Sequence, residues 1–217
     1  QVEAAGRACH LLPADLRTEQ ANDELARQAV EALGGLDVLV CNAAYQMTHD
    51  ELDAFPGQQI TRTFETNVFG PFWLVQALRD ELKGGTVIVT TSIQAMEPSS
   101  HLLDYASTKA ALNNLVVNLA AELGPQGTRV NAVAPGWIAS SGMDTYPESM
   151  KNMIRNLKDH VPLQRIGSES EVAAAIVFLL SPGANFISGN TIRIDGAASQ
   201  GTRAWTLGKA KNSESYN

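Results

Sequence analysis

The sequence is poor in cysteine and histidine and has no long apolar run. Cys9 and Cys41 are the only cysteines among 217 residues, which excludes a disulfide framework and a CxxC metal pair. The four histidines are scattered and none forms an HExxH motif, so we expect no metal site. No apolar stretch approaches the roughly 20 residues that a membrane-spanning helix needs. We therefore expect a protein of a reducing compartment, the cytoplasm, with no membrane partner.

Positive charge is also scarce. Lys and Arg number 16 against 23 Asp and Glu, which gives a formal charge of −7. An acidic chain without a Lys/Arg cluster is a poor binder of nucleic acid, so no such partner is expected. With 44% hydrophobic residues the chain can build one sizeable core. We expect a single domain over residues 1–217.

Short apolar runs alternate with longer helical patterns. The expected strands are CHLLPA (9–14), LDVLVC (36–41), TVIVTTS (86–92), TRVNAVAP (128–135) and NTIRID (190–195). The expected helices are 18–33, 61–82, 103–123 and 168–181, the last opening with the capping-box pair Ser168 and Glu171. This alternation predicts an α/β fold with a doubly wound parallel sheet, and the continuous apolar run 36–41 predicts a strand buried on both faces.

Three other stretches have no such pattern. Residues 45–57 are polar and should be mostly loop. Residues 139–165 are irregular, with a short helix expected near 147–157. Residues 201–217 lack a core pattern and are expected to form a C-terminal extension.

Small or polar residues follow each expected strand. They are Asp15 and Leu16, then Asn42 and Ala43, then Ser92, then Pro135, Gly136 and Ile138. Turn chemistry would explain any one of them. Ligands bind at the carboxyl ends of open parallel sheets, so together these residues predict a site on one rim.

The stretch DYASTKAA places Tyr105 and Lys109 one helical turn apart, on the same face. A nearby ammonium lowers the pKa of a phenol, which makes the pair a proton-transfer device. Ser92, at the end of the preceding strand, could hold a substrate oxygen beside the phenol. The alternative is a surface Tyr with a solvated Lys, against which the small neighbouring residues favour a tightly packed helix.

In family order, the stretches ADL (14–16), CNAA (41–44), TNVFG (66–70), Ser92, YASTK (105–109), RVNAVAPGWI (129–138) and GNTIRIDG (189–196) cover nearly the whole chain. The sequence thereby resembles the single-domain short-chain dehydrogenases/reductases, whose fold is Rossmann-like. The combination is specific, whereas YxxxK alone is weak. The wording SIQA…HLLDYASTKAA is similar to members grouped with sugar or polyol dehydrogenases and 3-oxoacyl reductases.

The resemblance implies a role for each catalytic residue. Tyr105 would be the general acid/base, and Ser92 would hydrogen-bond the reacting oxygen. Lys109 would lower the pKa of Tyr105 and bind the nicotinamide ribose. Asn67, at a helix distortion, would hold a water through its backbone carbonyl and so lead protons to Lys109.

The resemblance also implies NAD or NADP as cofactor and a small carbonyl or alcohol substrate. Besides Tyr105 and Lys109, the cofactor would contact Asp15, Leu16, Asn42 and Ala43 on the adenosine side, and Pro135, Gly136, Ile138 and Ser140 at the nicotinamide. Residues 139–165 would form a lid over the substrate. Helices 61–82 and 103–123, and the last strand with its helix, would join copies into a tetramer or dimer.

The largest departure from the family is a missing element. Family members begin with a strand and a TGxxxGxG turn, and no such turn occurs here. By resemblance, the first βαβ portion is missing, which would expose an edge of the 36–41 strand. We favour a longer protein of which this is a part; an aberrant fragment, and a shortened protein that no longer binds dinucleotide, are the alternatives.

A smaller departure lies in CNAA, where the family has Asn-Asn-Ala-Gly. Cys41 replaces an Asn, and a small buried thiol is the simplest interpretation. Ala44 replaces a Gly and tolerates a left-handed backbone less well, which leaves the local geometry open.

The sequence supports two hypotheses of function, one for an enzyme and one for a non-catalytic protein. The leading hypothesis is an NAD(P)-dependent oxidoreductase that interconverts an alcohol and a ketone or aldehyde. The alternative is a non-catalytic, cofactor-deficient binding or scaffold protein with the same fold. An epimerase or dehydratase sharing YxxxK is less favoured, because those chains usually carry a longer substrate domain. The sequence leaves the choice between NAD and NADP open.

Overall fold

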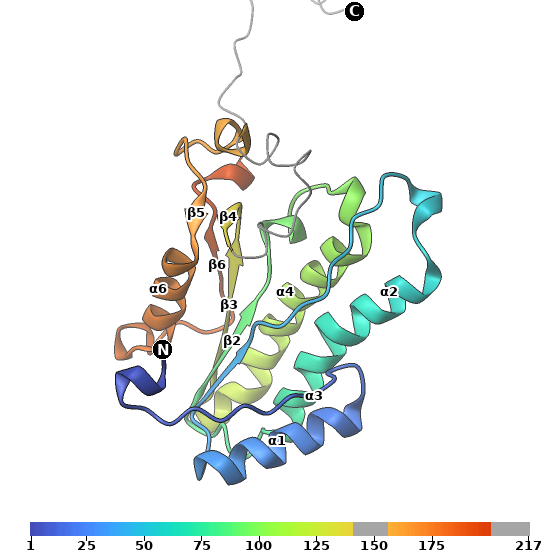
Figure 1. Cartoon of the computed structure of the whole chain (residues 1–217). Coiled ribbons are helices and arrows are strands. Elements are labelled where there is room, and N and C mark those ends of the chain that lie inside the picture. Colours follow the sequence, from blue (N-terminus) through green and yellow to red (C-terminus); the bar gives the residue numbers. More distant parts are fainter. Residues whose placement is uncertain (141–155, 201–217) are drawn as a thin grey trace, which may run out of the picture.

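A four-stranded parallel sheet forms the centre of the protein (Figure 1). The computed structural model describes residues 1–140 and 156–200. Its strands are β1 (Val38–Cys41), β2 (Thr86–Thr90), β3 (Arg129–Pro135) and β6 (Thr191–Ile194), in the order β1-β2-β3-β6. Two further strands, β4 (Ile138–Ala139) and β5 (Gly167–Ser168), pair with each other beyond the carboxyl end of β3. The predicted parallel α/β sheet is confirmed.

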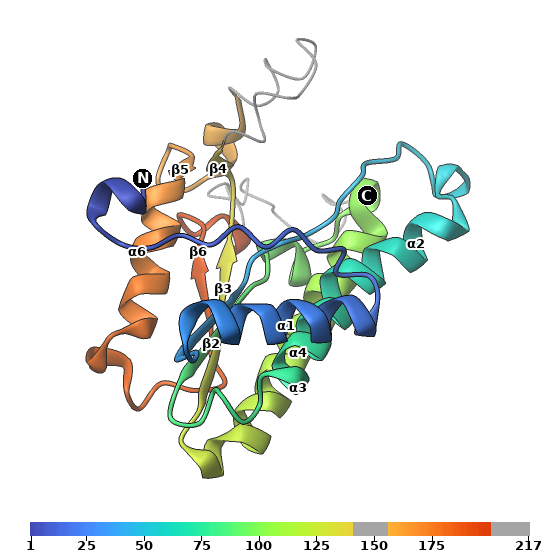
Figure 2. The ribbon, with the colours of Figure 1, turned by 60° about the horizontal axis from the view of Figure 1, so that its bottom comes forward.

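Helices cover both faces of this sheet (Figures 1 and 2). They are α1 (Glu19–Leu33), α2 (Gly57–Phe64), α3 (Gly70–Ala77), α4 (Leu103–Leu123) and α6 (Glu169–Leu180). α1, α3 and α4 lie on one side of the sheet and α6 on the other. No helix in the described ranges has the length and apolar character to cross a bilayer.

The hydrophobic core has two layers, one on each face of the sheet, because successive side chains of the central strands alternate between the faces. Val87, Val89 and Val130 are fully buried against α3 and α4, while Ile88 and Val133 are fully buried against α6. Successive strand residues point to opposite faces, so β-branched side chains at every position of β2 fill both layers. This packing sets the carboxyl ends of β2 and β3 beside each other.

Several helix ends follow the sequence closely. Thr18 caps α1 by accepting from the Ala21 N–H at 3.3 Å, and Gly34 ends the helix in the left-handed region with φ 75°. The predicted range 103–123 is that of α4. The capping box of Ser168 and Glu171 is also present at the start of α6.

Two strand predictions are wrong. Residues 9–14 form no strand, because no neighbouring strand lies beside them in the described structure, and Leu11 is 86% exposed. β1 is not buried on both faces: Val38 and Val40 are 40% and 38% exposed. Within the described residues β1 pairs only with β2 and is the edge of the sheet.

The predicted helix 61–82 is also corrected. Helical structure starts earlier, at Gly57, and α3 ends at Ala77, before a turn that closes at Gly84 with φ 74°. Between α2 and α3 lies a π-helical segment, Glu65–Phe69, which contains Asn67. The expected distortion at this residue is therefore present. The helix predicted near 147–157 falls mostly outside the described residues, and the extension 201–217 falls entirely outside them.

Candidate active site

A cavity of about 580 Å³ opens at the carboxyl ends of β2 and β3. It is where an open parallel sheet places its ligands. Of the predicted site residues, the cavity brings together Asn42, Ser92, Tyr105, Lys109, Pro135, Gly136, Ile138 and Ser140. Residues that the sequence did not single out complete the wall, among them Thr90, Gln94 and Trp137.

Tyr105 and Lys109 face the same cavity from the first turns of α4. The Lys109 Nζ lies over the Tyr105 ring, 5.3 Å from its centroid. Lys109 is only 2% exposed, and its Nζ donates to the Thr90 carbonyl at 2.7 Å. Burial lowers the pKa of Lys109 to about 8, against a smaller opposing effect of the neighbouring Cys41. The alternative of a solvated surface lysine is thereby excluded.

Ser92 is held at the end of β2 by the turn that follows it. Its side chain is almost fully buried, and its Oγ accepts the Gln94 N–H at 3.2 Å, which caps the short helical turn Ile93–Ala95. Within the described residues the Ser92 hydroxyl donates to no protein group. A hydroxyl fixed as an acceptor on one side can give its proton to a ligand in the cavity.

Asn67 lies outside the cavity wall and connects three elements. Its Oδ1 accepts the Tyr45 N–H at 2.7 Å, and its Nδ2 donates to the Tyr45 carbonyl at 2.9 Å and to the Thr108 hydroxyl at 3.0 Å. The side chain thus ties the loop after β1 to α4. The water-holding role of its backbone carbonyl stays a prediction.

Asp104 is a site residue that the sequence reasoning missed. It is 4% exposed, and its Oδ1 accepts the Tyr105 N–H at 2.8 Å. Its Oδ2 accepts from the Thr63 hydroxyl at 2.6 Å and from the Gln59 amide at 3.1 Å. A carboxylate in the first turn of a helix was a signal that could have identified it. The network fixes the turn that carries Tyr105 to α2.

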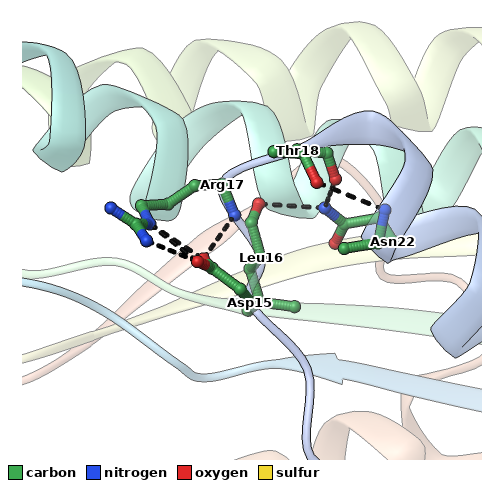
Figure 3. A network of polar contacts seen from close by, with 6 residues as sticks. Asp15, Leu16, Arg17, Thr18 and Asn22 are labelled. Carbon is green, nitrogen blue, oxygen red and sulfur yellow. Dashed lines mark hydrogen bonds and ion pairs between the residues drawn. The ribbon is translucent and has the colours of Figure 1, made fainter.

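The residues predicted for the adenosine side lie mostly outside this cavity. Asp15 is exposed and pairs with Arg17, whose Nε donates to it at 2.9 Å (Figure 3). Hydrogen bonds from Arg17 lower the pKa of Asp15 to about 2. The Leu16 carbonyl accepts from the Asn22 amide at 2.9 Å. Leu16 and Ala43 line a separate, apolar hollow, and Asn42 lines both it and the cavity.

The CNAA stretch adopts an ordinary backbone. Gln164 and Ala197 are the non-glycine residues with positive φ in the described ranges, so Ala44 needs no left-handed conformation. Cys41 is a buried free thiol, as expected, and burial raises its pKa to about 12. It is therefore neutral beside Lys109.

Comparison with known proteins decides the family. A family model described as enoyl-(acyl carrier protein) reductase matches residues 1–199. The chain belongs to the short-chain dehydrogenase/reductase family. It is 39% identical over 192 residues to the uncharacterized oxidoreductase YghA of Escherichia coli (strain K12), covering 86% of this chain and 64% of YghA.

Two other members of the family have more informative names. Glucose 1-dehydrogenase of Gluconobacter oxydans (strain 621H) is 36% identical, covering 84% of this chain and 69% of that protein. A short chain dehydrogenase from Burkholderia cenocepacia J2315, solved in complex with NADP, is 31% identical with a TM-score of 0.82, over 90% of this chain and 79% of that one. The chain spans about two thirds of the length of the curated relatives it matches.

Proposed function

We propose that the protein is an oxidoreductase that interconverts an alcohol and a ketone or aldehyde with NAD or NADP. The observation that carries this proposal is the buried Lys109 ammonium over the Tyr105 ring, in a cavity wall that Ser92 shares. Membership of a family whose relatives include glucose 1-dehydrogenase supports it. Tyr105 is the proposed general acid/base.

The donors in the cavity fit one end of the cofactor. A buried ammonium, the Ser140 hydroxyl and the Asn42 amide stand beside the apolar Pro135 and Ile138. Such a mixture of polar and apolar groups suits a ribose and a flat nicotinamide ring with its carboxamide. Lys109 and Tyr105 would bind the ribose, while Pro135, Gly136, Ile138 and Ser140 would hold the ring. Asp15, Leu16 and Ala43 remain proposed contacts of the adenosine end.

When bound, the cofactor supplies or removes a hydride at the reacting carbon. The protein supplies position and a proton. During reduction Tyr105 gives its phenolic proton to the carbonyl oxygen, and Ser92 donates a hydrogen bond to the same oxygen as negative charge develops there. Below its pKa of about 8 Lys109 is an ammonium, and its positive charge stabilises the phenolate that Tyr105 becomes after giving up its proton. The Asn67 carbonyl is proposed to hold the water that returns the proton.

A second copy of the chain is the proposed macromolecular partner. An apolar groove of about 600 Å³ lies between α3 and α4 and is lined by Phe69, Phe72, Trp73 and Leu115, among others. Phe69 and Phe72 are 43% and 42% exposed, and contact between apolar rings and water is unfavourable in free energy. Helix-to-helix packing of two copies, in a dimer or tetramer, would cover them. Residues 139–165 are proposed as the substrate lid, although 141–155 lie outside the described residues.

A binding or scaffold protein is the second candidate. The observation that favours it is the exposed, Arg17-paired state of Asp15, which would leave the adenosine end weakly held. Fluorescence titration with NADH and NADPH separates the candidates. Saturable binding supports the oxidoreductase, whereas no binding by the full-length protein supports the scaffold.

The proposal is tested by oxidation of NADH and NADPH with a panel of carbonyl compounds. We expect Tyr105→Phe in the full-length protein to lose about 100- to 10,000-fold in kcat, because the general acid is removed. Circular dichroism of the variant controls for folding. Equal activity of the wild type and Tyr105→Phe would refute the proposed acid.

A further inference from the structure

Gln94 holds an unsatisfied acceptor in the wall of the active-site cavity. It lies two residues after Ser92, within the turn Ile93–Ala95, and lines the cavity together with Ser92 and Tyr105. Its side-chain Oε1 is buried and, among the described residues, has no hydrogen-bond partner. A buried oxygen left unpaired costs about 1–3 kcal/mol, so native proteins keep few of them.

The hydroxyls of the two neighbouring threonines are satisfied within the protein. The Thr90 hydroxyl donates to the Asn42 amide oxygen at 3.0 Å, and the Thr91 hydroxyl donates to the Val133 carbonyl at 3.1 Å. Gln94 differs from both, although its backbone is fixed by the bond from its N–H to Ser92. The residue that carries the unpaired oxygen is therefore bonded, through its backbone, to the hydroxyl that is proposed to bind the reacting carbonyl.

The chemistry of this acceptor restricts the ligand. An amide oxygen needs a donor, which excludes a carboxylate and an alkyl group as its partner. A protonated amine would meet the buried ammonium of Lys109 in the same cavity and be repelled. A hydroxyl brings a donor without charge.

We propose that Gln94 selects substrates carrying a hydroxyl beside the reacting carbon and accepts a hydrogen bond from it. This inference rests on the proposed function. The oxygen is covered in this structure, so the amide must turn toward the cavity when the donor enters. Such a rotation about the terminal side-chain bond is soft. The substrates would then be hydroxyketones and their diols, and Gln94 would determine specificity without taking part in proton transfer.

The test compares hydroxyacetone with butanone, which replaces the hydroxyl with a methyl group of similar size. We expect the full-length protein to reduce hydroxyacetone with a kcat/KM about 10- to 100-fold higher. Gln94→Leu should bring the ratio close to one by losing activity on hydroxyacetone alone. Gln94→Glu, which keeps an acceptor at the same reach, should retain the preference. Gln20→Leu, at an exposed position of α1, is the matched control.

A binding measurement gives a second readout. Tryptophan emission, to which Trp137 in the cavity wall contributes, should respond to propylene glycol more than to sec-butanol, and this difference should disappear in Gln94→Leu. An unchanged ratio and an unchanged emission response in Gln94→Leu would overturn the inference, as would wild-type activity confined to carbonyls without a hydroxyl. Each of these results leaves the proposed function intact if Tyr105→Phe is inactive, so the two failures are distinguishable.

Discussion

The two ends of the predicted cofactor site differ sharply in how the protein holds them. At the β2–β3 end, Ser92 and Lys109 are almost fully buried; Ser92 accepts from the Gln94 N–H, and Lys109 donates to the Thr90 carbonyl on the neighbouring strand β2. At the β1 end, Asp15 is exposed and bonded to Arg17, two residues away in the chain. Fixed, desolvated groups suit chemistry, because their electrostatic effects are large and they need no reorganisation. The protein thus preorganises the proton-transfer end much more than the adenosine end.

Removing the Ser92 hydroxyl should give the largest effect at the buried end. We expect Ser92→Ala to lower kcat by about 100- to 1,000-fold, because one fixed donor to the developing oxyanion is lost. Steady-state kinetics with the best carbonyl substrate measures it. Ser107→Ala, which removes an exposed hydroxyl on α4, is the control. A Ser92→Ala enzyme with the kcat of the control would show that the buried end is not preorganised for catalysis.

The Asp104 network tests whether the buried end also depends on its support. Asp104→Ala removes the acceptor of the Tyr105 N–H and one of the two acceptors of each of the Thr63 hydroxyl and the Gln59 amide, which keep their bonds to the Gln59 and Met47 carbonyls. We expect the free energy of unfolding to fall by about 3 kcal/mol. Urea denaturation measures the change, with the exposed Asp53→Ala as control. A loss equal to that of the control would mean that the carboxylate does not hold α4 to α2.

The burial of Lys109 makes the free energy of unfolding depend on pH. Its pKa falls from 10.5 to about 8 on folding, which corresponds to roughly 3 kcal/mol. Below pH 8 it is protonated in both states and its burial destabilises the fold in full. Between pH 8 and 10.5 only the unfolded chain keeps the proton, so the free energy of unfolding rises with pH.

Lys109→Met should lack this rise. Urea denaturation of both proteins at several pH values between 8 and 10.5 measures the difference, with Lys83→Met as the exposed control. The Cys41 thiol, whose raised pKa acts in the opposite direction above pH 9, is present in all three proteins. Parallel curves for the wild type and Lys109→Met would contradict the buried ammonium.

The exposed end should respond least. Asp15→Asn is expected to weaken NADH or NADPH binding by about three- to tenfold, because an exposed hydrogen bond contributes little. Fluorescence titration measures the dissociation constant, and the exposed Asp23→Asn on α1 serves as control. A rise of the dissociation constant by about 100-fold or more, as large as the fall in kcat expected for Ser92→Ala, would contradict the difference between the two ends.

Local patterns predicted much of the fold and of this site. Spacing alone placed Tyr105 and Lys109 on one face of α4, and apolar runs placed β2 and β3 with Ser92 and Pro135 at their ends. These features depend on residues close in sequence. The resemblance supplied the distortion at Asn67.

Features that depend on distant neighbours were not predictable. Residues 9–14 read as a strand, but a strand needs a partner and the described structure gives them none. The hydrogen bond that holds the buried Lys109 ammonium reaches Thr90, 19 residues earlier in the chain. The bonds to Asp104 come from Gln59 and Thr63, which lie 45 and 41 residues before it. No periodicity in the sequence encodes such pairings.

The central claim is that the Lys109 ammonium readies the Tyr105 phenol to transfer a proton, and it can be measured without a substrate. Ultraviolet absorbance of tyrosinate is followed with pH in the wild type and in Lys109→Met, and the Tyr105→Phe spectra identify the contribution of Tyr105. We predict that the Tyr105 phenolate appears at lower pH in the wild type than in Lys109→Met. Appearance at the same pH in both proteins would contradict the account.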